Sequence, residues 1–313
     1  MGKTQKEQLE EITARLEQGI LELFNSERFR EYLRVMSQFH RYSLRNTILI
    51  AMQKPDATRV AGFNTWKTKF GRTVKKGEKG IRILAPAPKK LKQEQEKLDP
   101  KTKLPIIGED GEPVREEKEI VIPRYKIVSV FDVSQTEGRE LPDIAVDELT
   151  GSVERYEDFF AALKAVSPFP ITFAAIPGEA HGYCDYMSNC IVVDEGMSEL
   201  QTLKTTIHEI AHAKLHNTNA EGQAEKRVRA DRQTREVQAE SVAYTVCQHY
   251  GLDTSDYSFG YVVSWSSGRT LPELNSSLEI IHRAVDEIIS GIDRWFAELR
   301  QEQETGEQLE IAA

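Results

Sequence analysis

Cysteine is scarce in this sequence, and long apolar runs are absent from it. The 313 residues include only three cysteines, without CxxC spacing, so neither a disulfide framework nor a cysteine zinc site is indicated. No stretch approaches the roughly 20 apolar residues of a membrane span. The N-terminal lysines run into acidic residues without the apolar core of a signal peptide. These absences favour a protein of the reducing cytoplasm that has no membrane partner.

The charge is unevenly distributed along the chain. The formal net charge is -9, which taken alone argues against nucleic-acid binding. Residues 28–90, however, contain 16 Lys and Arg against 3 Asp and Glu, so this window carries 16 - 3 = +13. The length and the 39% hydrophobic share allow two ordinary domains with real cores.

The predicted secondary structure changes along the N-terminal half, from helices to short strands. Apolar residues at helical spacing predict helices over 4–24, 29–39 and 43–53. Short β-prone pieces follow from 58 to 84, among them the aromatic stretch 63–70 and a basic glycine-containing turn at 75–80. Residues 89–119 are dense in charge and read as a solvated hairpin extension, and strand patterns return over 119–133.

Aromatic residues are interleaved with the positive charges of the basic window. Single-strand nucleic-acid surfaces use this combination, because lysines and arginines follow phosphates while aromatic faces stack on bases. For the basic window taken alone, a solvated basic face over an aromatic core is the favoured alternative, and a surface for RNA or protein is a weaker one. The residues assigned to the nucleic-acid surface are Arg45, Trp66, Lys67, Lys69, Arg72, Lys75, Lys76 and Lys79.

The second half alternates helices with short strands. We expect a helix over 152–166, a strand over 171–176, a hairpin over 182–194, and helices over 199–216, 234–250 and 278–299. A polar, proline-containing stretch at 141–150 is the best interdomain linker, and 301–313 reads as a polar tail. The overall prediction is an α+β protein of two domains.

The sequence His208-Glu209-Ile-Ala-His212 lies inside the predicted helix 199–216. Residues four apart share a helix face, so the two imidazoles can bind one metal ion. Glu209 lies beside them and can take a proton from water. This is the arrangement of a hydrolytic zinc enzyme, although two structural histidines on a buried helix face would produce the same sequence motif.

A third ligand is expected on the helix 234–250. Glu236 and Glu240 are four apart and share a face, and only one of them need touch the metal. Small residues around Glu240 would allow close helix packing, which favours Glu240 as the ligand and Glu236 as a partner of a ligating histidine. His216 is expected to be structural, since a third consecutive turn of one straight helix cannot easily reach the same ion. His249, on the next helix, is a weaker candidate for a ligand and is also expected to be structural.

A zinc ion held by two histidines and a carboxylate leaves a position for water with a lowered pKa. Glu209 would then act as general base while zinc-activated water attacks a peptide carbonyl. A donor to the oxyanion is also required. The candidates left open for that role are Tyr183, Tyr186, Tyr244 and Tyr261.

Several stretches together resemble ArdC-type antirestriction proteins. In the N-terminal half these are residues 46–55, 62–66, 71–81 and 130–136; in the C-terminal half they are the HEIAH helix, the QAESVAY stretch at 238–244 and the hairpin upstream. The second half is also similar to zincins of the ImmA/IrrE-like type. The resemblance divides the chain into an N-terminal domain at 1–140 with a charged insert at 89–119, and a metallopeptidase domain at 151–300.

The resemblance implies binding of single-stranded DNA without strong sequence preference, in proteins of mobile elements that protect incoming DNA from restriction. Carried over to this sequence, it implies Zn²⁺ bound by His208, His212 and Glu240, with Glu209 as the catalytic acid and base. Two hypotheses follow: a DNA-binding metalloendopeptidase with an unidentified protein substrate, or a DNA-binding antirestriction protein whose zinc domain is structural. Glu209 favours the first, because a structural site does not need an acid beside the metal.

Overall fold

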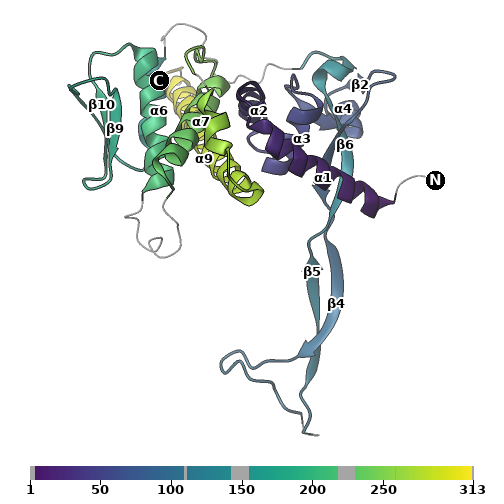
Figure 1. Cartoon of the computed structure of the whole chain (residues 1–313). Coiled ribbons are helices and arrows are strands. Elements are labelled where there is room, and N and C mark those ends of the chain that lie inside the picture. Colours follow the sequence, from purple (N-terminus) through teal and green to yellow (C-terminus); the bar gives the residue numbers. More distant parts are fainter. Residues whose placement is uncertain (1–3, 109–110, 142–154, 218–229, 258, 312–313) are drawn as a thin grey trace.

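The computed structural model describes residues 4–108, 111–141, 155–217, 230–257 and 259–311 (Figure 1). The chain begins with three packed helices: α1 (Gln5–Leu23), α2 (Ser26–Phe39) and α3 (Leu44–Gln53). Each starts where a polar side chain caps its first backbone amides: Thr4, Asn25 and Ser43 in turn. The three helices predicted at the N-terminus are therefore confirmed.

A small antiparallel sheet follows the three helices. Its strand order is β1 (Val60–Gly62), β6 (Tyr125–Asp132), β3 (Ile81–Pro86), while β2 (Arg72–Val74) pairs separately with β7 (Thr136–Gly138). The basic turn after β2 therefore leads to a different sheet and closes no hairpin. The aromatic stretch that we expected to be β-prone forms helix α4 (Phe63–Lys69), because Trp66 turns inward and its Nε1 donates to the Phe131 carbonyl at 2.8 Å.

A two-stranded arm projects from this domain (Figure 1). Strands β4 (Lys89–Glu96) and β5 (Arg115–Ile122) pair over eight residues each, which confirms the predicted hairpin extension. Cross-strand ion pairs lie along it, with Lys90 and Lys92 Nζ at 2.7 and 2.8 Å from Glu119 and Glu117. All four side chains are largely exposed, so these pairs contribute little to stability.

The C-terminal half combines a small mixed sheet with helices. Strand β10 (Cys190–Asp194) lies between β8 (Ile171–Ala174), to which it is parallel, and β9 (Gly182–Asp185), to which it is antiparallel. The helices are α5 (Tyr156–Val166), α6 (Glu199–His216), α7 (Arg232–His249), α8 (Tyr261–Ser266) and α9 (Leu271–Ile311). Helix α9 continues to Ile311 and so includes residues 301–311 of the predicted polar tail, and the predicted linker lies outside the described residues except for its first residue, 141.

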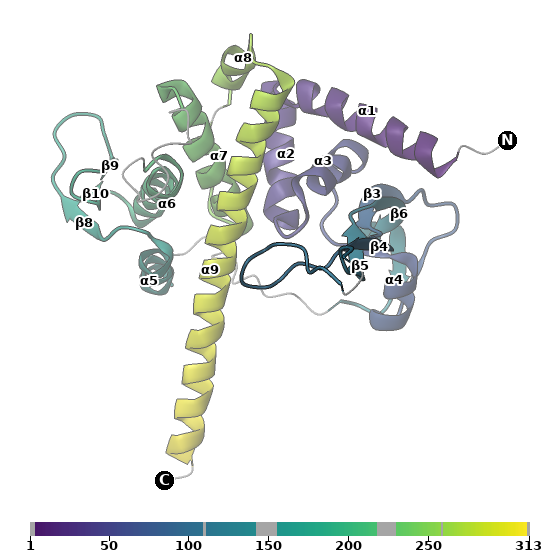
Figure 2. The same ribbon diagram turned by 90° about the horizontal axis from the view of Figure 1, so that it is seen from below.

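The two halves share one hydrophobic core. Helix α9 runs between the N-terminal helices and α5–α7, and it packs against both groups (Figure 2). The ring of Phe24 lies 5.4 Å from that of Trp265, and the ring of Phe29 lies 5.5 Å from that of Phe259. The predicted α+β class with two domains is confirmed, and the domains are joined by an extensive apolar contact.

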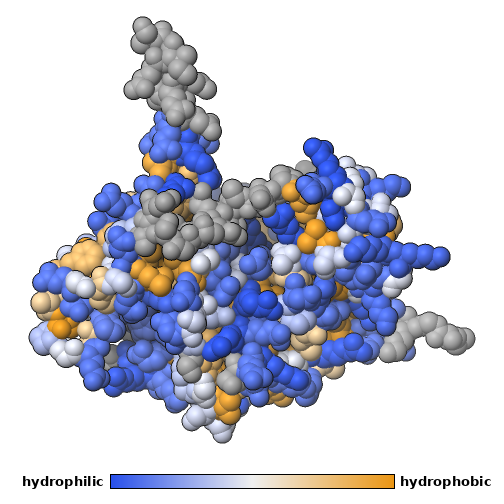
Figure 3. Space-filling model, turned by 90° about the horizontal axis from the view of Figure 1, so that it is seen from above, coloured by the Kyte–Doolittle hydropathy of each residue, from blue (hydrophilic) through white to orange (hydrophobic). Residues whose placement is uncertain are grey.

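The outer surface is mainly hydrophilic. The face in Figure 3 shows hydrophobic residues only in small, separate groups. Among the described helices, none combines the length and apolar character needed to cross a bilayer.

Asp132 fixes the end of β6 in the N-terminal domain. It is 1% exposed, its Oδ1 accepts from the amides of Thr58 and Arg59 at 2.8 and 3.0 Å, and its Oδ2 accepts from the amide and hydroxyl of Ser134. Burial alone would raise the pKa of this carboxyl, but these hydrogen bonds outweigh it and hold the pKa below 3.8. Asp132 therefore joins three segments of the domain as an anion.

Replacing Asp132 with Asn is expected to lower the free energy of unfolding by about 2 kcal/mol at neutral pH, because the charged acceptor is removed. Since the folded-state pKa is depressed, this stabilisation is complete above the unfolded pKa and is lost as the pH falls through the folded one. The difference between wild type and variant, measured by urea denaturation, should shrink at low pH. A constant difference would show that the charge of Asp132 is not the stabilising feature.

Candidate metal centre

Helix α6 presents the HEIAH residues at the surface of the C-terminal core. Ser198 caps the helix by accepting from the amide of Gln201, whose own side chain donates to Thr205 rather than back to the cap. Ile207, Ile210 and Ala211 are fully buried and anchor the opposite side of the helix. His208 and His212 therefore point together toward α7, with their Nε2 atoms 3.0 Å apart.

Glu236 of α7 completes a cluster of three donors. Its Oε2 lies 3.7 Å from His208 Nε2 and 3.5 Å from His212 Nε2. One ligand atom from each of the three residues lies within 4.8 Å of the others. Two imidazole nitrogens and one carboxylate oxygen in this arrangement fit a divalent metal with an open coordination position. The pKa of Glu236 lies well below its usual range, because both histidines hydrogen-bond to it.

Glu240, the expected third ligand, also lies against His208. Its Oε2 lies 3.4 Å from His208 Nδ1, on the side of the ring away from the cluster. Both glutamates thus lie against the histidines: Glu236 Oε2 lies near both Nε2 atoms, and Glu240 Oε2 lies near His208 Nδ1. Burial alone would lower the pKa of His208, but hydrogen bonds to Glu236 and Glu240 raise it to about 9.

The tautomer of His212 is fixed by a chain of hydrogen bonds. Gln238 Oε1 can only accept, so His216 Nε2 donates to it at 3.0 Å, and His216 Nδ1 is left to accept from His212 Nδ1 at 3.0 Å. Gln238 Nε2 donates to the hydroxyl of Ser277, which orients the amide. Burial keeps His216 neutral by lowering its pKa to about 4. His212 Nε2 therefore keeps its lone pair for a metal.

Glu209 lies beside the histidines and is 7% exposed. Burial raises the pKa of its carboxyl, as a general base working near neutral pH requires. Strand β9 approaches closely here: a Cβ at Gly182 would meet Thr205 Cγ2 at 2.7 Å and Glu209 Cγ at 3.3 Å. Only glycine at position 182 allows the sheet to press against Glu209 in this way.

A pocket of about 280 Å³ opens beside His208, between β9, α6 and the segment after α7; His212 and Glu236 are not among its lining residues. His208, Glu209 and Glu240 line it, together with residues that sequence reasoning missed: His181, Lys204, Asp256 and Tyr257. Lys204 lies one turn before His208, and its Nζ is 2.6 Å from Asp256 Oδ1. The helical spacing from His208 could have indicated Lys204, whereas Asp256 and Tyr257 reach the site only through the tertiary fold.

The four tyrosines considered as oxyanion donors lie near the site but do not line this pocket. The wall of the pocket contains Tyr257 in place of these four. Tyr186 donates to the carbonyl of His212 at 3.2 Å, Tyr244 packs against Tyr257 and Phe259, and Tyr183 is 48% exposed. Burial raises the pKa of Tyr261, and the nearby carboxylates of Glu240 and Glu236 raise it further.

The basic surface of the N-terminal domain differs from the expected set in two residues. Trp66 is 1% exposed and packs inside against Phe70, so it cannot stack on a base. The guanidinium of Arg72 is committed to Thr136 and the carbonyl of Arg139, so it holds β7 in place. The side chains of Arg45, Lys67, Lys69, Lys75, Lys76 and Lys79 are exposed. Phe63 and Phe70 are exposed aromatic residues next to Lys67 and Lys69.

Comparison with known proteins matches two family models to the chain. The N-terminal domain of anti-restriction factor ArdC matches residues 3–131, and the IrrE N-terminal-like domain matches residues 168–250. An uncharacterized protein of Bacillus anthracis is 31% identical over 330 residues, which cover 96% of this chain and 54% of that protein. The chain thus spans about half the length of this relative. DNA primase TraC of Escherichia coli is 36% identical over 96 residues, 30% of this chain and 9% of its own.

Solved structures give a weaker likeness to the chain. The antirestriction ArdC protein from the R388 plasmid, in its metal-free crystal structure, is 22% identical with a TM-score of 0.44, covering 81% of this chain and 84% of its own. Its Mn(II)-bound structure is 21% identical with a TM-score of 0.42, covering 82% and 84%.

Proposed function

The chain belongs to the antirestriction ArdC family by its N-terminal domain and carries an IrrE-like, metallopeptidase-like C-terminal domain, and on this premise we propose that it is a zinc metallopeptidase that binds single-stranded DNA. The observation that carries the peptidase half is the placement of buried Glu209 beside the His208–His212–Glu236 cluster.

His208, His212 and Glu236 would hold the zinc ion, and Glu240 and His216 would orient the two histidines. Two nitrogens and one oxygen are the donor set of many catalytic zinc sites. When bound there, zinc supplies Lewis-acid activation of water and of a carbonyl group. Compared with the set expected from the sequence, this ligand set has Glu236 in place of Glu240. Glu209 does not bind the metal in either set.

Glu209 takes the proton of the attacking water and returns it to the leaving nitrogen. Its burial makes the carboxylate a better base, because the raised pKa lies closer to working pH. Within the described sheet, β9 is an edge strand beside the pocket, so an extended peptide can pair with its free backbone groups. We therefore propose an extended segment of protein as the substrate.

This peptidase activity is tested by incubating the full chain and zinc with a mixture of unstructured peptides, with and without single-stranded DNA. Mass spectrometry should detect new peptide termini that chelation with EDTA prevents. If the peptides stay intact under all conditions, the peptidase part of the proposal is wrong and only the DNA-binding part remains.

Single-stranded DNA is proposed to bind along α4 and the loop after β2. Phe63 is 51% exposed and Phe70 38%, and both flank the exposed lysines Lys67 and Lys69. Alternating aromatic faces and cations suit stacked bases and phosphates without reading sequence.

The Lys67→Ala/Lys69→Ala variant is expected to weaken binding of single strands and to reduce the salt slope by roughly 0.7 for each phosphate that it no longer neutralises. Phe63→Ala should cost about 1–3 kcal/mol because one base can no longer stack. Fluorescence anisotropy over a salt series measures both effects. Lys164→Ala on α5, an exposed lysine of the other domain, is the matched control and should bind as wild type does. Equal affinity of all variants would place the DNA elsewhere.

A further inference from the structure

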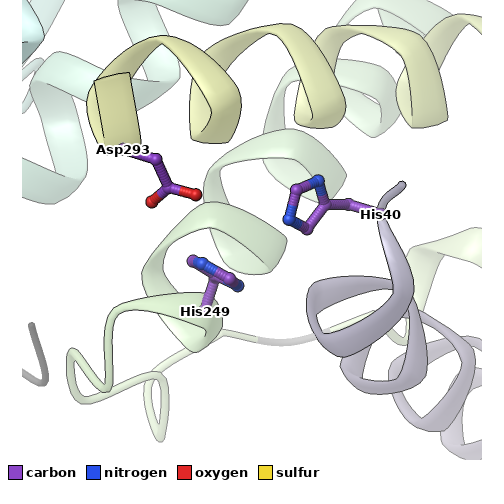
Figure 4. Close-up of side chains that lie close together, drawn as sticks. All are labelled: His40, His249 and Asp293. Atoms are coloured by element: carbon purple, nitrogen blue, oxygen red, sulfur yellow. The ribbon is translucent and has the colours of Figure 1, made fainter. Parts of the chain in front are cut away.

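A second group of metal-binding side chains lies where the two domains meet. His40 follows the last residue of α2, His249 ends α7, and Asp293 lies on α9; one ligand atom from each is within 4.8 Å of the others (Figure 4). The side chains point toward one another between the three helices. His40 is 5% exposed, so the cluster lies inside the junction.

Both rings are held by hydrogen bonds at the same nitrogen. His40 Nδ1 lies 3.0 Å from Asp286 Oδ1, and His249 Nδ1 lies 2.7 Å from the Ser37 carbonyl. A carbonyl oxygen can only accept, as can an ionised carboxylate, so Nδ1 carries the hydrogen in each ring. Nε2 is then the nitrogen with a free lone pair when the ring is neutral. Metal-binding histidines are commonly oriented in this way by a carboxylate or carbonyl.

Asp293 is oriented as well. The hydroxyl of Tyr250 donates to its Oδ1 at 2.9 Å, and an Arg41 nitrogen lies 3.3 Å from its Oδ2. A carboxylate has about four lone-pair positions, so it can still bind a metal. The Arg41 side chain is 70% exposed, and solvent screens most of its repulsion toward a cation.

The three residues come from three different parts of the chain. His40 lies in the region matched to the ArdC N-terminal domain, His249 in the region matched to the IrrE-like domain, and Asp293 outside both. The rings of His40 and His249 meet edge to face at 5.2 Å, so the cluster exists only when α2 and α7 are packed. An ion bound here would stabilise the contact between the domains.

We propose that His40, His249 and Asp293 form a second zinc-type metal site that fastens the N-terminal helices to the metallopeptidase-like domain. Two imidazole nitrogens and one carboxylate oxygen suit zinc and related divalent transition metals. Donors around tetrahedral zinc lie roughly 3.3 Å apart, which small side-chain rotations can reach from the observed separations. The site is separate from HEIAH and makes no use of Glu209.

The test uses the full chain with His208→Ala and His212→Ala, which removes two donors of the HEIAH cluster. After loading with Zn²⁺ or Co²⁺ and desalting, this protein should retain about one equivalent of metal, and bound Co²⁺ should absorb in the visible range. Zn²⁺ at roughly a hundred times Kd should raise its Tm by about 5 °C, because the metal binds only the folded junction.

Two added substitutions locate the retained metal. His249→Asn keeps a donor for the Ser37 carbonyl but removes Nε2, and Asp293→Asn keeps an acceptor for Tyr250; each should weaken metal binding at least about tenfold. Glu279→Gln, which removes an exposed carboxylate on the same helix α9 fourteen residues before Asp293, is the matched control and should leave binding unchanged.

Loss of all metal from the HEIAH double variant would overturn the proposal, as would unchanged affinity in folded His249→Asn and Asp293→Asn proteins. Circular dichroism establishes folding, and if one of these two variants fails to fold, the other decides.

Discussion

Glu209→Gln is expected to lower peptide cleavage by about 10²–10⁴-fold, the usual contribution of a general base. Gln has nearly the same size and can occupy the tight space beside Gly182, where Glu209 Cγ is already in close contact. It cannot accept the proton of the attacking water. Metal content and affinity for single-stranded DNA should stay at wild-type values, because neither the donor cluster nor the basic surface includes Glu209.

Cleavage of the peptide mixture, followed by mass spectrometry at matched metal content, measures this effect. Glu199→Gln, an exposed glutamate in the first turn of the same helix, is the matched control and should cleave normally. Undiminished cleavage by Glu209→Gln would remove Glu209 from the mechanism. Absence of cleavage in both wild type and variant would support the alternative function, a DNA-binding antirestriction protein with a structural metal domain.

The HEIAH helix could be predicted from the sequence because its geometry depends only on neighbouring residues. Helical periodicity fixes that His208 and His212 share a face whatever surrounds them, and Ser198 marks the start of the helix at the predicted place. The hairpin of β9 and β10 was equally local. The positions of Glu236 and Glu240 depend instead on how α7 is rotated and shifted against α6, which only tertiary packing decides.

Prediction of the basic surface from sequence meets the same limit, because exposure of a side chain depends on tertiary packing. Composition indicates that positive charge gathers in residues 28–90, but it cannot tell an exposed aromatic from a buried one. Trp66 and Phe63 lie three residues apart on α4, and one is 1% exposed while the other is 51% exposed. The difference arises because β6 offers the Phe131 carbonyl to the indole on one face of the helix. The junction cluster combines His40 with two residues that lie more than 200 positions further along the chain, His249 and Asp293, and no spacing rule relates the three.

Replacing each glutamate of α7 in turn with glutamine is expected to distinguish the contributions of Glu236 and Glu240 to metal affinity. Glu240→Gln removes the anion beside His208 Nδ1 and should weaken zinc binding by about 10–100-fold, the usual effect of removing a partner behind a ligand. Glu236→Gln should weaken it by more than about a hundredfold, because it removes the anionic oxygen that lies near both Nε2 atoms.

Both variants should be compared in the His249→Asn background, so that a single site is titrated, with a competing chelator to reach tight affinities. Glu236 is half exposed and Glu240 is less so, and neither lies in the apolar core, so the two substitutions should leave the fold intact. Glu287→Gln, an exposed glutamate of α9, is the matched control. A larger loss in Glu240→Gln than in Glu236→Gln would return Glu240 to the ligand set and make Glu236 its supporting acid. Comparing the two losses in zinc affinity would therefore decide whether Glu236 or Glu240 binds the metal. The glutamate that is not a ligand would then be the one next to the open part of the site, where a substrate can enter.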